Sequence, residues 1–184
     1  ESKLEILKTA VIAAAELLNP AFQIGVLGFD AAPTWVLPFT EAGEREEIRT
    51  GLKRLSAGGG TELYPALEEA YRGLISASAA VKHLIILSDG LVQQAPFEEL
   101  VVRMAADGIT VTTVAVGTDS DRELLEKIAR WGGGRSYFAR AVDSAPRIFA
   151  SESMIVARRM LQDETFFPGL GETHPILLGF EERE

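Results

Sequence analysis

The chain has 184 residues, of which 47% are hydrophobic, which is enough for one compact domain with a sizeable buried core. Its formal net charge of −9 argues against nucleic acid as a partner, because a phosphate backbone requires a basic surface. The absence of cysteine excludes disulfides and thiolate chemistry. The longest apolar runs are of strand length, far short of the roughly 20 residues of a membrane helix, so we expect a soluble domain that does not insert into membranes.

Helical and strand periodicities alternate along the chain. In order, they predict helix 4–18, strands 22–29 and 34–39, helices 41–55 and 63–75, strand 81–87, helix 96–106, strand 109–116, helix 122–130, strand 136–138 and helix 144–161. The first two strands resemble a hairpin, and Pro38 favours an edge position because proline cannot donate to a ladder. The later strands alternate with helices. This pattern predicts an α/β doubly wound fold: a mostly parallel sheet, one antiparallel edge strand, and helices on both faces.

In sheets of this kind, ligands bind beyond the carboxyl ends of the strands. Two polar loops of the sequence are candidates for such a position. Three glycines precede Thr61, and the most apolar strand ends in Ser88-Asp89-Gly90. Hydroxyl and carboxylate oxygens suit Mg²⁺ or Mn²⁺. Each loop also has an ordinary interpretation, a flexible connection for the glycines and a capped turn for Asp89. Nucleotide binding has little support, because no Gly-Lys-Ser/Thr follows the glycines.

The segments GGGTELYPAL and LIILSDG resemble the second and third loops of the metal-ion-dependent adhesion site (MIDAS) of von Willebrand factor A (vWA) domains. Further likeness in GVLGFD, GITVTTVAVGTD and LLEKIARWGGGRSYFA extends the resemblance over residues 1–161, which leaves 162–184 as a tail or a linker to a following domain. The resemblance implies a Rossmann-like vWA fold with Thr61 and Asp89 as metal ligands. The implied partner-binding rim consists of Gly59, Gly60, Gly90 and Asp30.

One part of the family pattern is absent from this sequence. The first MIDAS loop, Asp-x-Ser-x-Ser, and the strand before it should precede helix 4–18, and no such motif occurs there. In the family that strand lies centrally, between the strands that correspond to 22–29 and 81–87. We therefore expect a gap in the sheet, with Mg²⁺ or Mn²⁺ binding weak or absent in this fragment. Another segment could fill the gap, either from a neighbouring copy through strand exchange or from the apolar residues 174–180 of the tail.

The resemblance implies a non-enzymatic protein-interaction module, in which an acidic side chain of a partner protein completes the coordination of the cation. It further resembles a bacterial subgroup in which the vWA domain belongs to a membrane-anchored protein with a glutamine amidotransferase-like domain. Two alternatives stay open: a metal-assisted hydrolase or phosphoryl-transfer enzyme using Asp89, and a structural vWA scaffold without metal. His83, Trp35 and Trp131 are expected to serve packing rather than chemistry.

Overall fold

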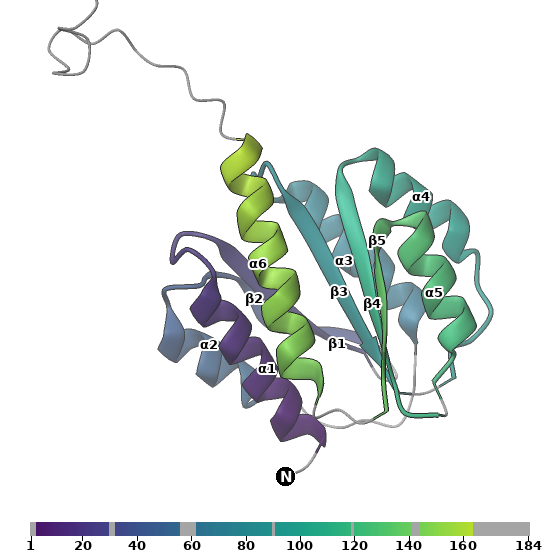
Figure 1. The fold of residues 1–184 in the computed structure, drawn as a ribbon, viewed down its shortest axis with the longest axis horizontal. Coiled ribbons are helices and arrows are strands. Elements are labelled where there is room, and N and C mark those ends of the chain that lie inside the picture. Colours follow the sequence, from purple (N-terminus) through teal and green to yellow (C-terminus); the bar gives the residue numbers. More distant parts are fainter. Residues whose placement is uncertain are drawn as a thin grey trace, which may run out of the picture.

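The computed structural model describes residues 3–29, 32–55, 62–89, 91–118, 120–140 and 144–163 (Figure 1). Helices and strands follow in the order α1 (Lys3–Leu17), β1 (Gln23–Phe29), β2 (Pro33–Glu41), α2 (Arg45–Leu52), α3 (Leu63–Ser76), β3 (Lys82–Ser88), α4 (Phe97–Ala106), β4 (Ile109–Val116), α5 (Arg122–Trp131), β5 (Gly133–Ala139) and α6 (Ala145–Asp163). This order confirms the predicted α/β succession. Among these residues, no helix has the length and apolar character needed to cross a membrane.

The strands form two separate hydrogen-bonded sheets. β1 and β2 pair in antiparallel fashion, from Gln23 opposite Glu41 to Phe29 opposite Pro33. β3, β4 and β5 form a parallel sheet with β4 in the centre. Within the described part of the chain, no ladder joins β1 to β3. The sheet is therefore interrupted between the two segments where the sequence predicts a gap, and Pro38 lies on β2, which pairs with β1 alone.

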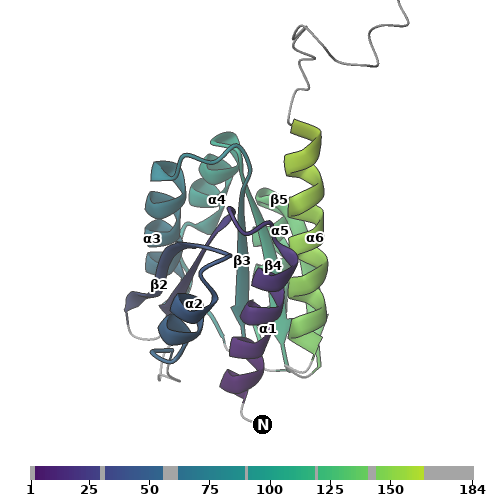
Figure 2. The same cartoon turned by 90° about the vertical axis from the view of Figure 1, so that its left-hand side faces the viewer.

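Helices cover both faces of the parallel sheet, as predicted. Figure 2 shows the strands between α3 and α4 on one side and α1 and α6 on the other. Alternate residues of β4 supply the two cores, because successive side chains of a strand point to opposite faces. Val111 belongs to the core formed with α3, α4 and α5, whereas Val114 and Val116 belong to the core formed with α1 and α6. β4 is therefore covered by a core on each of its faces.

Strand burial follows the pairing. All residues of β4 except Thr110 are buried, because ladders and helices enclose this strand on every side. No residue of β1 is buried, and only Ile86 and Ser88 of β3 are. The apolar residues of α1 are also mainly half-buried, with only Ala10 and Ala15 fully enclosed. Apolar side chains on three elements around the interruption thus retain exposure that a further strand would remove.

Among the predicted boundaries that differ from the structure, two have a clear physical reason. The helix expected from residue 41 begins instead at Arg45, because β2 continues to Glu41 and a turn follows, in which Ala42 N donates to Phe22 O. The strand expected at 136–138 begins earlier, at Gly133. Gly133 has a φ of +64°, which glycine adopts without strain, so the chain turns directly from α5 into β5.

Candidate functional site

Asp89 follows the last residue of β3 and has an exposed side chain. The apolar residues of β3 pack against both helical layers, and this packing fixes where the strand ends. In the parallel register Ser88 lies opposite Ala115 of β4, and Val116 lies opposite Ala139 of β5. The carboxyl ends of all three strands therefore share one edge. The structure places Asp89 at that edge, where the sequence predicts it.

The remaining predicted site residues lie outside the described residues: Thr61, Gly59, Gly60, Gly90 and Asp30. Their neighbours in the chain are described. Glu62 precedes α3, and its Oε1 accepts a hydrogen bond of 2.9 Å from Gln93 Nε2 in the segment that follows β3. The ring centroids of Tyr64 and Phe97 lie 5.5 Å apart in an edge-to-face arrangement. These contacts join the chain that directly follows Thr61 to the chain that follows Asp89.

Ser88 is a further polar residue at this edge; the sequence places it in the same loop as Asp89 but does not predict it as a ligand. Its side chain is buried, and its Oγ has no hydrogen-bond partner among the described residues. A buried hydroxyl without a partner is costly, and such an atom is satisfied by a ligand or by a donor from elsewhere. The signal available in the sequence was its position between an apolar strand and Asp89.

The chemistry of the oxygen atoms at this edge fits a hard divalent cation, because hydroxyl and carboxylate are the donors that Mg²⁺ and Mn²⁺ prefer. The described residues contain no group of three or more His, Cys, Asp or Glu side chains that could hold a metal ion. Asp89 and Ser88 alone supply too few oxygen atoms for a complete coordination shell. A complete ligand set therefore requires oxygens from outside the described part of the chain.

An exposed apolar side chain stands next to this edge. Leu91 is 75% exposed, whereas the neighbouring Val92 is only 9% exposed and packs into the core beneath α3 and α4. Val92 thus anchors the segment while Leu91 is left on the surface. An exposed leucine two residues after Asp89 provides an apolar contact beside the candidate metal ligand, of the kind found within interfaces.

A second polar group lies nearer the amino ends of the strands. We call it the Glu152 cluster; it consists of Glu152, Arg135, Tyr137, Thr112 and His83. His83 is the second residue of β3, so the cluster lies towards the opposite end of that strand from Asp89. Burial by itself would raise the pKa of Glu152, but contacts with His83, Arg135 and Tyr137 outweigh it and hold that pKa well below its usual range.

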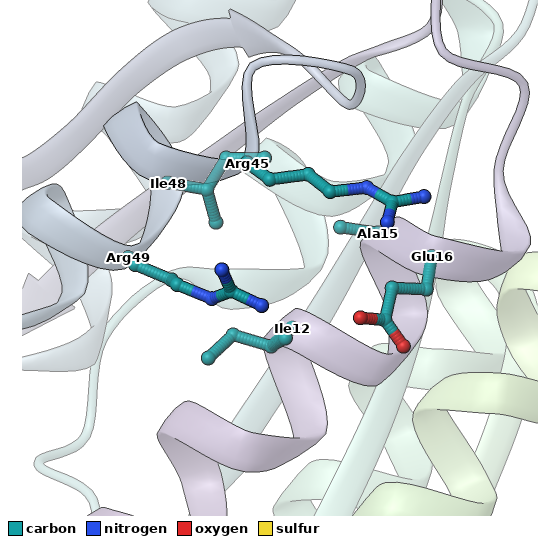
Figure 3. Close-up of a pocket in the computed structure, with 6 residues that line it drawn as sticks. All are labelled: Ile12, Ala15, Glu16, Arg45, Ile48 and Arg49. Atoms are coloured by element: carbon teal, nitrogen blue, oxygen red, sulfur yellow. The ribbon is translucent and has the colours of Figure 1, made fainter.

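A shallow hollow lies between α1 and α2, away from either polar group (Figure 3). Ile12, Ala15 and Ile48 form its apolar part, and the longer side chains of Glu16, Arg45 and Arg49 surround it. It contains none of the predicted site residues. We assign the hollow no role in the candidate site.

Comparisons with known proteins agree with this geometry. The family described as the von Willebrand factor type A domain matches residues 1–151. Among curated proteins, no match was found. A solved von Willebrand factor type A structure from Catenulispora acidiphila is similar, with 23% identity and a TM-score of 0.71. The alignment covers 82% of this chain but only 37% of the other, so this chain spans well under half of that protein's length.

Two further structures show the same fold. An aerotolerance-related membrane protein from Bacteroides fragilis has 17% identity and a TM-score of 0.69, with 83% of this chain and 88% of that chain covered. Proximal thread matrix protein 1 from the mussel byssus, in a structure with a zinc-occupied MIDAS motif, has 18% identity and a TM-score of 0.67, with 84% and 42% covered. From the family match over most of its length, and from a fold shared with these structures, the chain belongs to the von Willebrand factor type A family.

Proposed function

We propose that this vWA domain is a protein-interaction module that binds a carboxylate of a partner protein through Mg²⁺ or Mn²⁺ at the carboxyl edge of β3. One observation carries the proposal: the hydrogen bond from Gln93 to Glu62 joins the segments next to Asp89 and Thr61. The two residues that resemble MIDAS ligands thus adjoin chain segments that are in contact, although they are 28 positions apart in the sequence. Zinc occupies the MIDAS motif of the mussel protein, which supports a divalent cation here.

The donor set suggests how such a complex would form. Asp89 supplies a carboxylate oxygen and Thr61 a hydroxyl oxygen, and an aspartate or glutamate of the partner would complete the coordination shell. The glycines at 59, 60 and 90 would let the partner approach the backbone closely, with Asp30 at the rim. Leu91 would add an apolar contact beside the metal. This combination of metal ligands, small residues and an apolar contact is typical of a binding site.

The interruption of the sheet bears on metal affinity. A strand placed between β1 and β3 and parallel to β3 would end next to Asp89, because parallel strands share their carboxyl edge. By resemblance it would carry the Asp-x-Ser-x-Ser oxygens that the described residues lack. We therefore propose that metal binding and completion of the sheet are coupled. A further segment of the polypeptide, a neighbouring copy or residues 174–180 could supply the strand.

We also propose that the domain, at residues 1–161, belongs to a bacterial membrane-anchored protein, with 162–184 as its linker. The name of the Bacteroides fragilis structure, a membrane protein that this chain matches over 88% of its length, supports this setting. The family generally serves binding rather than catalysis, so we propose that the domain is not an enzyme. Neither the hydrolase alternative nor a scaffold without metal is favoured by a specific contact in the structure.

Calorimetric titration with Mg²⁺ and Mn²⁺ tests the metal site. The titration should compare this chain with one extended upstream by about 30 residues, enough to supply a strand and a loop. We expect binding by the extended protein and weaker binding by this chain. Thr61→Ala and Asp89→Ala should each lower the affinity by at least about tenfold, since even outer partners of metal ligands typically contribute about 10- to 100-fold.

A matched control is Glu123→Ala, which removes an exposed carboxylate from α5 without touching the carboxyl edge of β3. Its metal affinity should equal that of the parent. If the extended parent binds neither ion, the domain acts as a vWA scaffold without metal and the proposal is wrong.

A further inference from the structure

Glu152 of α6 is the centre of a buried network of hydrogen bonds. Its side chain has no exposed surface. Arg135 Nε donates to Oε1 at 2.7 Å, and Arg135 Nη2 donates to Oε2 at 2.9 Å. This is a bidentate ion pair, a strong arrangement of an arginine and a carboxylate. Tyr137 Oη donates to Oε1 at 2.7 Å. These three bonds connect α6 to β5.

The other strands of the parallel sheet contribute as well. Thr112 Oγ1 of β4 donates to Glu152 Oε2 at 3.1 Å. His83 Nε2 of β3 lies 3.1 Å from the same oxygen, without the geometry of a hydrogen bond. His83 Nδ1 in turn lies 2.6 Å from Thr110 Oγ1. The Glu152 cluster therefore joins α6 to all three strands of the sheet.

The remainder of α6 is held less specifically. Of its described side chains, only those of Ala145, Glu152 and Ser153 are buried. Ile148 and Phe149 contact the core while staying half-buried, and the helix lies along α1 (Figures 1 and 2). Contacts between apolar surfaces tolerate sliding, whereas a carboxylate with hydrogen-bond donors on β4 and β5 and an imidazole of β3 beside it is satisfied at one position only. Glu152 thus fixes the position of α6 on the sheet.

We propose that the Glu152 cluster is a latch that holds α6 on the sheet, and that α6 undocks as a unit when the carboxylate is neutralised while β3, β4 and β5 remain folded. Undocking would uncover the half-buried apolar residues Ile85 and Leu87 of β3 and Leu7 of α1, which pack in the same core. This proposal does not depend on the metal site.

Hydrogen exchange of backbone amides in the full chain, resolved by peptide or by residue, tests the latch. Glu152→Gln keeps the shape of the side chain but removes its charge and one acceptor oxygen. We expect amides of α6 to exchange about 100-fold faster, the scale expected when one partner of a buried ion pair is removed, through an opening that depends little on urea. The amides of β4 should stay better protected than those of α6 and keep the steep urea dependence of global unfolding. Met154→Ala, at a 48% exposed position on the same helix, is the matched control and should leave α6 protection unchanged.

A milder variant covers the case in which Glu152→Gln does not fold. Tyr137→Phe removes one hydrogen bond to Glu152 and keeps the ring, so α6 exchange should rise by about two- to tenfold, again with little dependence on urea and with β4 better protected than α6. Two results would overturn the proposal. One is that amides of α6 and β4 exchange in both variants at the same free energy and with the same steep urea dependence, which would make the cluster part of a single cooperative core. The other is that α6 protection is unchanged in both.

Discussion

Gln93 Nε2 donates a hydrogen bond of 2.9 Å to Glu62 Oε1, across 31 positions of the sequence. The bond joins the segment between β3 and α4 to the start of α3. Gln93 is exposed, so the bond should contribute little to global stability. Its importance is positional, because Glu62 directly follows Thr61 and Gln93 lies four residues after Asp89.

We predict that Gln93→Ala weakens Mn²⁺ binding in a protein with a complete site by about two- to tenfold, the range expected for one hydrogen bond. The thermal midpoint should stay nearly constant. Calorimetric titration and a melting curve on the same sample measure the two effects. Gln94→Ala, the neighbouring exposed glutamine, is the control and should change neither quantity. Unchanged metal affinity in Gln93→Ala would mean that the bond does not position the site.

Arg135 and Glu152 should behave as a coupled pair in a double-mutant cycle. Glu152→Leu leaves the guanidinium of Arg135 without its partner, and Arg135→Met leaves a buried carboxylate short of two donors. Arg135→Met should lower the free energy of unfolding by about 3 kcal/mol, because it leaves a buried charge. Glu152→Leu should lower it by less, because the side chain of Arg135 is 37% exposed and water can solvate its charge. The double variant should lose less than the sum of the two. Urea unfolding measures this coupling, and strictly additive losses would contradict it.

Acid should destabilise the domain partly through Glu152. Because the folded-state pKa of Glu152 is lowered, its stabilising contribution is present above the unfolded-state pKa, near 4.3, and is lost as the pH falls towards the folded-state pKa. Below about pH 4, the free energy of unfolding should therefore fall with decreasing pH, and Glu152 should contribute at most about 1.4 kcal/mol per pH unit to this fall.

Urea unfolding between pH 2 and pH 6 tests this sign. Glu152→Gln should flatten the slope, and Glu123→Gln should leave it almost unchanged, because hydrogen-bonded Glu123 lies in water where charge interactions are screened. An equal slope in wild type and Glu152→Gln would show that other carboxylates account for acid unfolding.

Two glycines should respond differently to alanine. At Gly134 a Cβ would lie 2.1 Å from Val111 O, so Gly134→Ala must displace β5 from β4 and should prevent stable folding or cost several kcal/mol. At Gly108 the φ is +76° and a Cβ would meet nothing within 4 Å. Gly108→Ala should therefore cost only about 1 to 2 kcal/mol, from the left-handed backbone. Thermal melts of the two variants make the comparison, and similar losses would contradict the proposed close approach.

The succession of elements could be read from the chain because hydrophobic periodicity is a local property. Residues 109–116 form an uninterrupted run of apolar and β-branched residues, and they form β4 with the predicted bounds. The helix expected from residue 41 was wrong at its start, because the pairing of β2 with β1 continues to Glu41. Where a strand ends depends on how far its partner strand pairs with it, and the local hydrophobic periodicity contains no information about the partner.

The sequence by itself determined the α/β order and the position of Asp89 at a strand end, since both follow from the hydrophobic pattern of consecutive residues. The interruption between β1 and β3 was expected from the resemblance to vWA domains, not from that pattern. Thr61 and the glycines near it remain predictions. Only the tertiary structure decided that Glu62 contacts Gln93 and that Glu152 is buried among polar residues of three strands. A glutamate in a helix is ordinarily solvated, and its burial here follows from how α6 lies on the sheet, which no local pattern encodes.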